Sequence, residues 1–119
     1  DLTTHIAEEL DSNVFVPAVG QGAVALECRG DDARTAEALK SINDDVTSTS
    51  VTVERAYLGE LGAGCSAPVG AHVVGKSLTA FLGGAKMNFR ATIELSGDLE
   101  RDLEAARALA VTARSTAGV

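Results

Sequence analysis

The second half of the chain alternates between apolar and polar positions in a way that predicts three strands. Apolar residues recur at every second position over 69–73, 78–82 and 89–95, which is the period of a strand with one buried face. Glycines at position 75 and at positions 83–84 separate these segments and favour turns. The pattern therefore predicts an antiparallel sheet of three strands.

Apolar residues before and after the three expected strands recur at helical spacing. Before them, apolar positions predict a helix from about residue 46 to Leu61, which Gly62 ends. After them, Asp98 is suited to cap a final helix, and its core side carries Leu99, Leu103, Ala106 and Ala110. Residues 46–117 therefore predict a small α+β domain, a three-stranded antiparallel sheet with helices on one face.

The first 45 residues follow a less regular pattern. We expect a short helix over 3–10, short strands over 14–16 and 23–27, and a helix that starts at Asp31–Asp32 and reaches about residue 42. The 23–27 stretch is apolar at most positions, so we expect it to be buried on both faces. Cys28, at the end of this stretch, is expected to be structural.

Composition narrows the class of protein. A chain of 119 residues suffices for one core, and 45% hydrophobic but only 3% aromatic residues predict an aliphatic, alanine-rich one. No apolar run approaches the roughly 18 residues of a membrane span, and no signal peptide is recognisable. Two cysteines without CxxC spacing indicate neither a disulfide framework nor a metal site. These features favour a cytoplasmic, reduced protein.

The net charge argues against two classes of binding partner. A net charge of −7 disfavours binding to nucleic acid and to anionic membranes, because both need clustered lysines and arginines. The chain holds only 10 lysines and arginines in all, most of them on expected helices beside acidic residues. Ligands with several carboxylates would find few partners here.

Cys65 lies in the segment GAGCSAPVG, which runs from Gly62 to Gly70. Its glycines permit a positive φ and close approach of a bulky group, and Pro68 stiffens the exit. Two interpretations stay open: a helix cap with Cys65 as a small buried residue, or a thiol presented for covalent attachment. A protease-like nucleophile would need a nearby base, but both His5 and His72 are expected on the surface.

Two further patterns have simpler explanations. Residues 20–25 fit the glycine-rich G-x-G-x-x-A fingerprint of dinucleotide-binding sites, but a strand-like run follows where that fingerprint requires a helix. A tight crossover between domains explains these glycines better. Glu54 and Arg55 are neighbours on the expected helix, where an exposed salt bridge is the usual arrangement.

Four segments in fixed order resemble the porphobilinogen deaminase (hydroxymethylbilane synthase) family: PAVGQGAVALECR, DDART, ERA and GAGCSAPVG. The resemblance implies a transferase that condenses four porphobilinogen molecules into hydroxymethylbilane in tetrapyrrole (heme) biosynthesis. It also implies that Cys65 binds the dipyrromethane cofactor through a thioether. Gln21 would contact this cofactor as an uncharged donor and acceptor beside pyrrole NH and carboxylate groups.

The resemblance further implies that the chain is the C-terminal part of such an enzyme. Residues 1–30 would be the tail of the middle domain and a crossover strand of the first, 31–45 a connecting helix and linker, and 46–119 the cofactor-attachment domain. The family's catalytic aspartate has no counterpart here, so no catalytic residue is expected. The expected partners are the missing N-terminal domains, porphobilinogen and oligopyrrole intermediates.

Other classes of function stay open from the residues alone. The chain would also suit a small α+β binding or regulatory module with a free thiol and no covalent ligand, or an interaction domain that docks on a separate catalytic chain. The mass of the purified protein distinguishes the first of these from a tether, because bound dipyrromethane adds two pyrrole rings.

Overall fold

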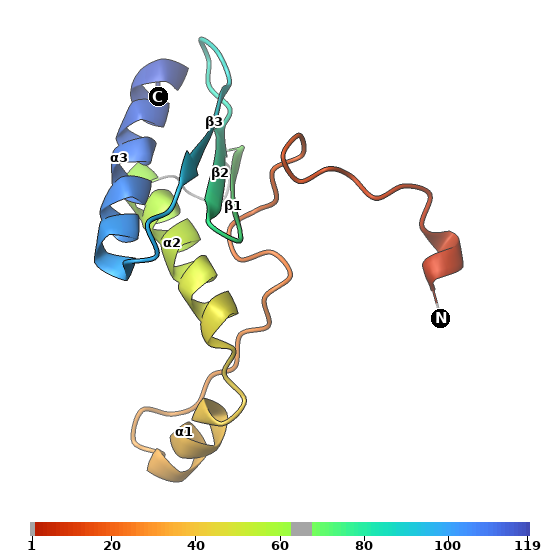
Figure 1. Ribbon diagram of the computed structural model, residues 1–119, viewed down its shortest axis with the longest axis vertical. Helices are drawn as coiled ribbons and strands as arrows, with labels where there is room; N and C mark the ends of the chain where they lie inside the picture. The colour runs from red at the N-terminus through yellow and green to blue at the C-terminus, as the bar shows by residue number, and fades with distance from the viewer. Residues whose placement is uncertain (1, 63–67) are drawn as a thin grey trace.

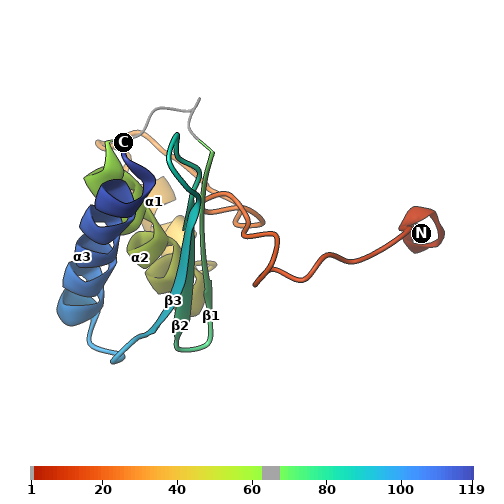
Figure 2. The ribbon, with the colours of Figure 1, turned by 90° about the horizontal axis from the view of Figure 1, so that it is seen from above.

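The computed structural model describes residues 2–62 and 68–119 (Figure 1). The elements are η1 (Thr3–His5), α1 (Ala33–Lys40), α2 (Asp45–Leu61), β1 (Val69–Val74), β2 (Ser77–Leu82), β3 (Phe89–Glu94) and α3 (Leu99–Ala117). Helices α2 and α3 cover one face of the sheet, and α1 stands apart beyond the first turn of α2 (Figures 1 and 2). The expected α+β class is confirmed.

The sheet has the strand order β1-β2-β3 with antiparallel pairs throughout. Its helix-facing rows follow the predicted alternation: they are Val69–Leu82–Phe89, Ala71–Ala80–Ala91 and Val73–Leu78–Ile93. Among the described residues, every buried hydrophobic one lies between Val53 and Ala117. The sheet and its two covering helices therefore form one core.

Small side chains bring the layers of this core close together. Helix α3 buries four alanines, and α2 and α3 pack against each other. Tyr57 of α2 is fully buried, and its hydroxyl donates to the carbonyl of Phe81 in the sheet. Burial raises the pKa of Tyr57 to about 12, so the phenol keeps its proton. An alanine-rich core was expected from the composition, and this packing confirms it.

Aspartates begin each of the three α-helices. Asp32, Asp44 and Asp98 each accept a hydrogen bond from the backbone N–H three residues later. The caps at Asp32 and Asp98 were expected from the sequence. Hydrogen bonds from Thr35 and Thr47 lower the pKa of Asp32 and Asp44, respectively.

The expectations for the first 30 residues are largely wrong. Only Thr3–His5 is helical, as a single 3-10 turn, and neither 14–16 nor 23–27 forms a strand. Val24 is 87% exposed, and Cys28 is exposed rather than structural. A strand needs a neighbour to satisfy its backbone groups, and these stretches find none among the described residues. None of the helices in residues 2–62 and 68–119 is long and apolar enough to cross a membrane.

Two glycines of the domain predict opposite effects on stability. A Cβ at Gly83 would lie 2.5 Å from Cγ of the rigid Pro68 ring, whereas a Cβ at Gly59 in α2 meets nothing within 4 Å. Gly83→Ala should lower the free energy of unfolding by about 1–3 kcal/mol, because the strand ends must separate. Gly59→Ala should raise it by about 0.5–1 kcal/mol, because alanine favours the helix. Urea denaturation measures both, and a neutral Gly83→Ala would contradict the described contact.

Asp102 of α3 predicts a pH-dependent contribution to stability. Burial opposes its ionisation, but hydrogen bonds from Ser96 and Gly97, with the charge of Lys76, outweigh burial and lower the pKa of the carboxyl. A lowered native pKa stabilises the fold above the unfolded value of about 3.9, and this stability disappears as the pH falls through the native value.

The variant Asp102→Asn should therefore unfold more easily than the original chain at pH 7, by about 1–3 kcal/mol. The difference should shrink as the pH falls below about 4, where the original carboxylate takes up its proton. Thermal denaturation across this pH range measures the effect. A difference that stays constant down to pH 2 would show that the charge of Asp102 is not what matters.

Candidate functional site

The segment that carries Cys65 joins α2 to β1, and residues 63–67, Cys65 included, lie outside the described residues. Both ends of the segment are described. Gly62 ends α2 with a φ of 61°, a left-handed conformation that glycine adopts without strain. Pro68 leads into β1, and its carbonyl accepts a hydrogen bond of 2.8 Å from the N–H of Gly83. The two ends are thus fixed to the helix and to the sheet.

The surroundings of Pro68 are tightly packed. The connection between β2 and β3 presses on the end of α3, where a Cβ at Gly84 would lie 2.3 Å from the carbonyl oxygen of Ala117. The N–H of Lys86 donates to that same carbonyl at 3.3 Å. The start of β1, the β2–β3 connection and the end of α3 therefore form one rigid end of the domain.

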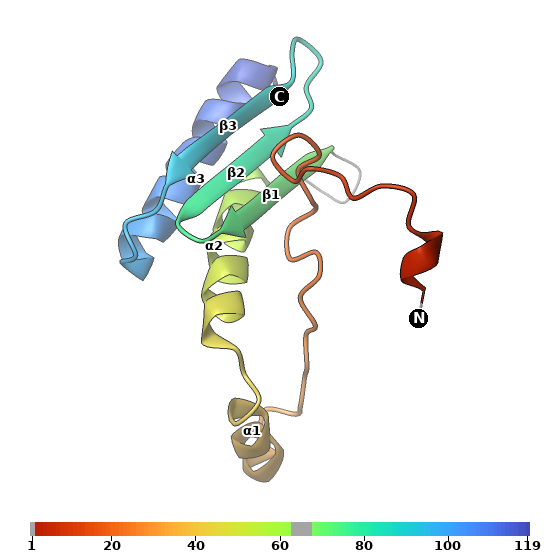
Figure 3. The same ribbon diagram turned by 45° about the vertical axis from the view of Figure 1, so that its right-hand side comes forward.

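Residues 13–18, the crossing segment, run over the sheet face opposite the helices (Figure 3). They follow the cross-strand row Gly70–Phe81–Arg90. The guanidinium of Arg90 donates to the carbonyls of Asn13 and Val14, both at 3.3 Å. At the other end of the row, a Cβ at Gly70 would lie 2.7 Å from the carbonyl oxygen of Val16, so only glycine admits this approach.

Gln21 lies in a compact turn, residues 18–23, that directly follows the crossing segment. Gly20 and Gly22 take positive φ values of 72° and 87° on either side of it. The N–H of Gln21 donates to the carbonyl of Ala18, and the N–H of Ala18 donates to Oε1 of Gln21, both at 3.0 Å. The side-chain oxygen of Gln21 is therefore part of the turn, and this bond orients the side chain.

Glu54 contradicts the expectation of an exposed pair with Arg55. Its side chain is only 5% exposed, and its carboxylate accepts hydrogen bonds from the N–H groups of Gly20 and Val73, both at 2.8 Å. Nδ1 of His72 lies 3.5 Å away, and that side chain is 30% exposed rather than on the open surface. The helical pattern contains the signal for this burial, because Glu54 precedes the apolar Tyr57 by three residues and Leu61 by seven, which places it on their face of the helix.

The edge of β1 that faces away from β2 is covered by these contacts. The N–H of Ala71 donates to the carbonyl of Pro17 at 3.0 Å, and the next outward N–H, that of Val73, donates to Glu54. Exposed strand edges otherwise seek additional strands. The crossing segment and Glu54 thus close the sheet on this side, and they fix the Gln21 turn beside β1.

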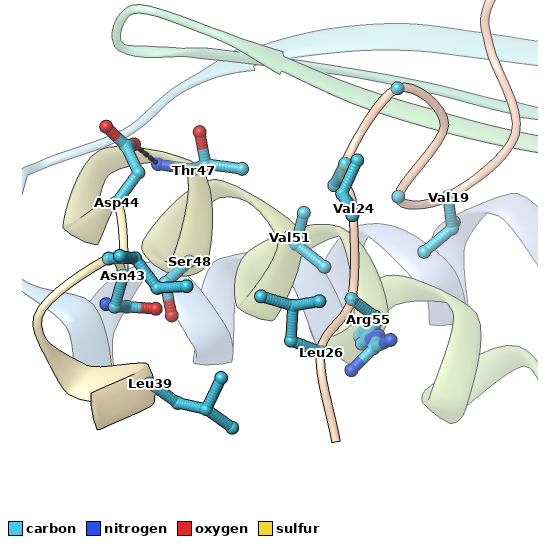
Figure 4. A pocket seen from close by; sticks show the side chains of 15 residues that line it. Val19, Val24, Leu26, Leu39, Asn43, Asp44, Thr47, Ser48, Val51 and Arg55 are labelled. Carbon is cyan, nitrogen blue, oxygen red and sulfur yellow. Dashed lines mark hydrogen bonds between the residues drawn. The ribbon is translucent and has the colours of Figure 1, made fainter. Parts of the chain in front are cut away.

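A cavity of about 540 Å³ lies between residues 19–26 and the helices α1 and α2. Val24, Leu26 and Val51 gather at one end with Arg55, and Asp44 and Ser48 lie at the other (Figure 4). Residues 23–29 continue as non-helical chain, so the glycines of the fingerprint face no helix N-terminus. Within the described ranges, no group of three or more metal-binding side chains exists.

Comparison with known families gives two matches in chain order. Residues 1–37 match the family model described as "Porphobilinogen deaminase, dipyromethane cofactor binding domain". Residues 48–116 match the model described as "Porphobilinogen deaminase, C-terminal domain". The second match begins near the start of α2 and ends near the end of α3, so it spans the core described above.

Similar curated proteins carry the same name. The chain is 41% identical over 125 residues to a porphobilinogen deaminase of Cutibacterium acnes, a match that covers 91% of this chain and 37% of that relative. It is 50% identical over 73 residues to the enzyme of Deinococcus radiodurans, with 61% of this chain and 24% of the relative covered. The chain therefore spans about a quarter to a third of these relatives' length. Together, these matches show that the chain belongs to the porphobilinogen deaminase family.

Proposed function

We propose that this chain is the C-terminal part of a hydroxymethylbilane synthase and serves as its tether for the growing pyrrole chain. The observation that carries the proposal is the family match over 48–116, because it contains the Cys65 segment together with both of its anchored ends. In the whole enzyme, four porphobilinogen molecules would be condensed into hydroxymethylbilane, a step of tetrapyrrole biosynthesis. We place this reaction in the cytoplasm, where a cysteine thiol stays reduced.

Cys65 is the residue that we propose for covalent attachment of dipyrromethane through a thioether. The cofactor, when bound, supplies a two-pyrrole primer to which substrate units are added. The described residues fit a tether, since Gly62 and Pro68 hold the ends of the segment on a helix and on a packed strand end. Segment ends that are fixed in this way favour the orientation of an attached ligand, because less motion has to be restricted.

Gln21 is proposed as a second contact to the cofactor. Its Nε2 group would donate to a carboxylate of the ligand, and its Oε1, which already accepts from the N–H of Ala18, has a second lone pair for a pyrrole NH. These are the donor and acceptor roles that the family resemblance implies. Gln21 is exposed, and it lines a hollow of about 530 Å³ together with Phe81 and the crossing segment.

Three of the described cations are already engaged by other groups of the chain. Arg29 is paired with Asp31 and Lys40 with Glu37 on the open surface, and Arg90 is bonded to the crossing segment. Acetate and propionate groups of pyrroles need several such partners. We therefore propose that further domains provide them, with residues 1–30 and 31–45 as the connection and 46–119 as the attachment domain.

The attachment site can be tested by substitution of each cysteine in a full-length deaminase that contains this segment. Cys65→Ala should abolish the mass increase that corresponds to bound dipyrromethane, because the thioether sulfur is lost. Cys28→Ala should retain the full increase, since Cys28 is exposed on a different part of the chain. Intact-protein mass spectrometry measures both variants, and an adduct mapped to Cys28 would refute the assignment.

The 119-residue chain on its own should not convert porphobilinogen. Ammonia release requires a general acid, and the pyrrolic cation requires a positioned carboxylate, neither of which we assign here. The expected product is below detection in an assay in which a full-length relative, such as the Cutibacterium acnes enzyme, produces hydroxymethylbilane steadily. Steady turnover by the purified chain would mean that the catalytic groups lie within it.

A further inference from the structure

Glu54 differs from the other buried acidic residue of the domain, Asp102. Asp102 accepts hydrogen bonds from Ser96 and Gly97, which are its neighbours in sequence and shape the start of α3. Glu54 instead binds Gly20, which precedes it by 34 residues, and Val73, which follows it by 19. It therefore joins three parts of the chain that are remote in sequence.

Burial of the Glu54 carboxylate costs free energy, so the hydrogen bonds that it accepts have to offset this cost. A buried charge is unfavourable unless hydrogen bonds replace the lost water, and here two backbone N–H groups do so. All fully buried hydrophobic residues among those described lie between Val53 and Ala117, and from the turn only Val19 packs against them, as a partly buried side chain. What Glu54 adds is the attachment of a turn that has no regular secondary structure of its own.

The crossing segment, which leads into the Gln21 turn, is also fixed on the sheet face opposite the helices. Arg90 of β3 fixes the carbonyls of residues 13 and 14, and Gly70 of β1 admits the carbonyl of Val16. Glu54 then fixes Gly20, directly beside Gln21. The chain is thus fixed before and within the turn, and the Gln21 amide has a defined position relative to the start of β1.

We propose that Glu54 is a positioning residue that fixes the Gln21 turn to α2 and β1, the two elements that the segment with Cys65 joins. The functional part of this inference rests on the proposed function above. Its physical part does not, because it concerns only the hydrogen bonds between Glu54, Gly20 and Val73. The two parts therefore have separate tests.

Amide hydrogen exchange of the 119-residue chain tests the physical part. Glu54→Ala removes both acceptor oxygens, so the N–H groups of Gly20 and Val73 both lose this partner. Exchange at the Gly20 amide should accelerate about tenfold or more, while Ala80 and Ala91 in the sheet keep their protection. The matched control Glu104→Ala removes a carboxylate from an exposed position of α3 and should leave Gly20 unchanged.

Unchanged exchange at Gly20 in Glu54→Ala would overturn the proposal, as would fast exchange at Gly20 in the original chain. If Glu54→Ala does not fold, the milder Glu54→Gln provides the test, because one of the two acceptor oxygens is replaced by an NH₂ group. Exchange should then accelerate at the Gly20 amide or at the Val73 amide, and unchanged exchange at both in a folded Glu54→Gln chain would contradict the proposal.

A double-mutant cycle in a full-length deaminase that contains this segment tests the functional part. If Glu54 acts through Gln21, Glu54→Gln with Gln21→Ala should lower kcat/KM no further than the more severe single variant. A general loss of stability would instead make the two effects multiply, and that result would overturn the positioning role. A full-length protein without cofactor mass or turnover would refute the proposed function instead, and the exchange experiment would still decide the physical part.

Discussion

The unpaired edge of β1 is the constraint on which the arrangement of this chain depends. Two successive outward N–H groups of an edge strand must be satisfied, and here the carbonyl of Pro17 and the carboxylate of Glu54 accept from them. A fourth strand beside β1 would have covered the edge equally well. Because a loop carbonyl and a side chain do so instead, the N-terminal stretch is drawn to the domain at a few fixed points.

The packing of small residues explains why this domain suits a fixed attachment point. Alanines on α3 and glycines at 83 and 84 let the helix end, the β2–β3 connection and Pro68 meet at short range. Side chains with many rotamers would loosen that end, whereas glycine, alanine and proline have little freedom to lose. The segment that holds Cys65 thus starts and ends on the least deformable part of the domain.

The two proposed ligand-binding residues, Cys65 and Gln21, are attached to the domain in different ways. The Cys65 segment is covalently continuous with α2 and β1, so its ends need no further fixing than the core provides. Gln21 lies in an irregular turn, and the position of that turn depends on hydrogen bonds that Glu54 and the side-chain oxygen of Gln21 accept from backbone N–H groups. Stability of the core and position of the turn are therefore separable properties, which allows one to be altered while the other is measured.

The sequence by itself determined the domain from α2 to α3. Alternation over 69–95, the caps at Asp32 and Asp98 and the stop at Gly62 are local signals, and local geometry decides such elements. It also determined the family, through short motifs in fixed order. Only the tertiary structure decided what became of 14–16 and 23–27, Cys28 and Glu54. A strand forms only where another strand pairs with it, and a buried carboxylate is stable only where hydrogen-bond donors reach it. In both cases the partner comes from residues that are remote in sequence.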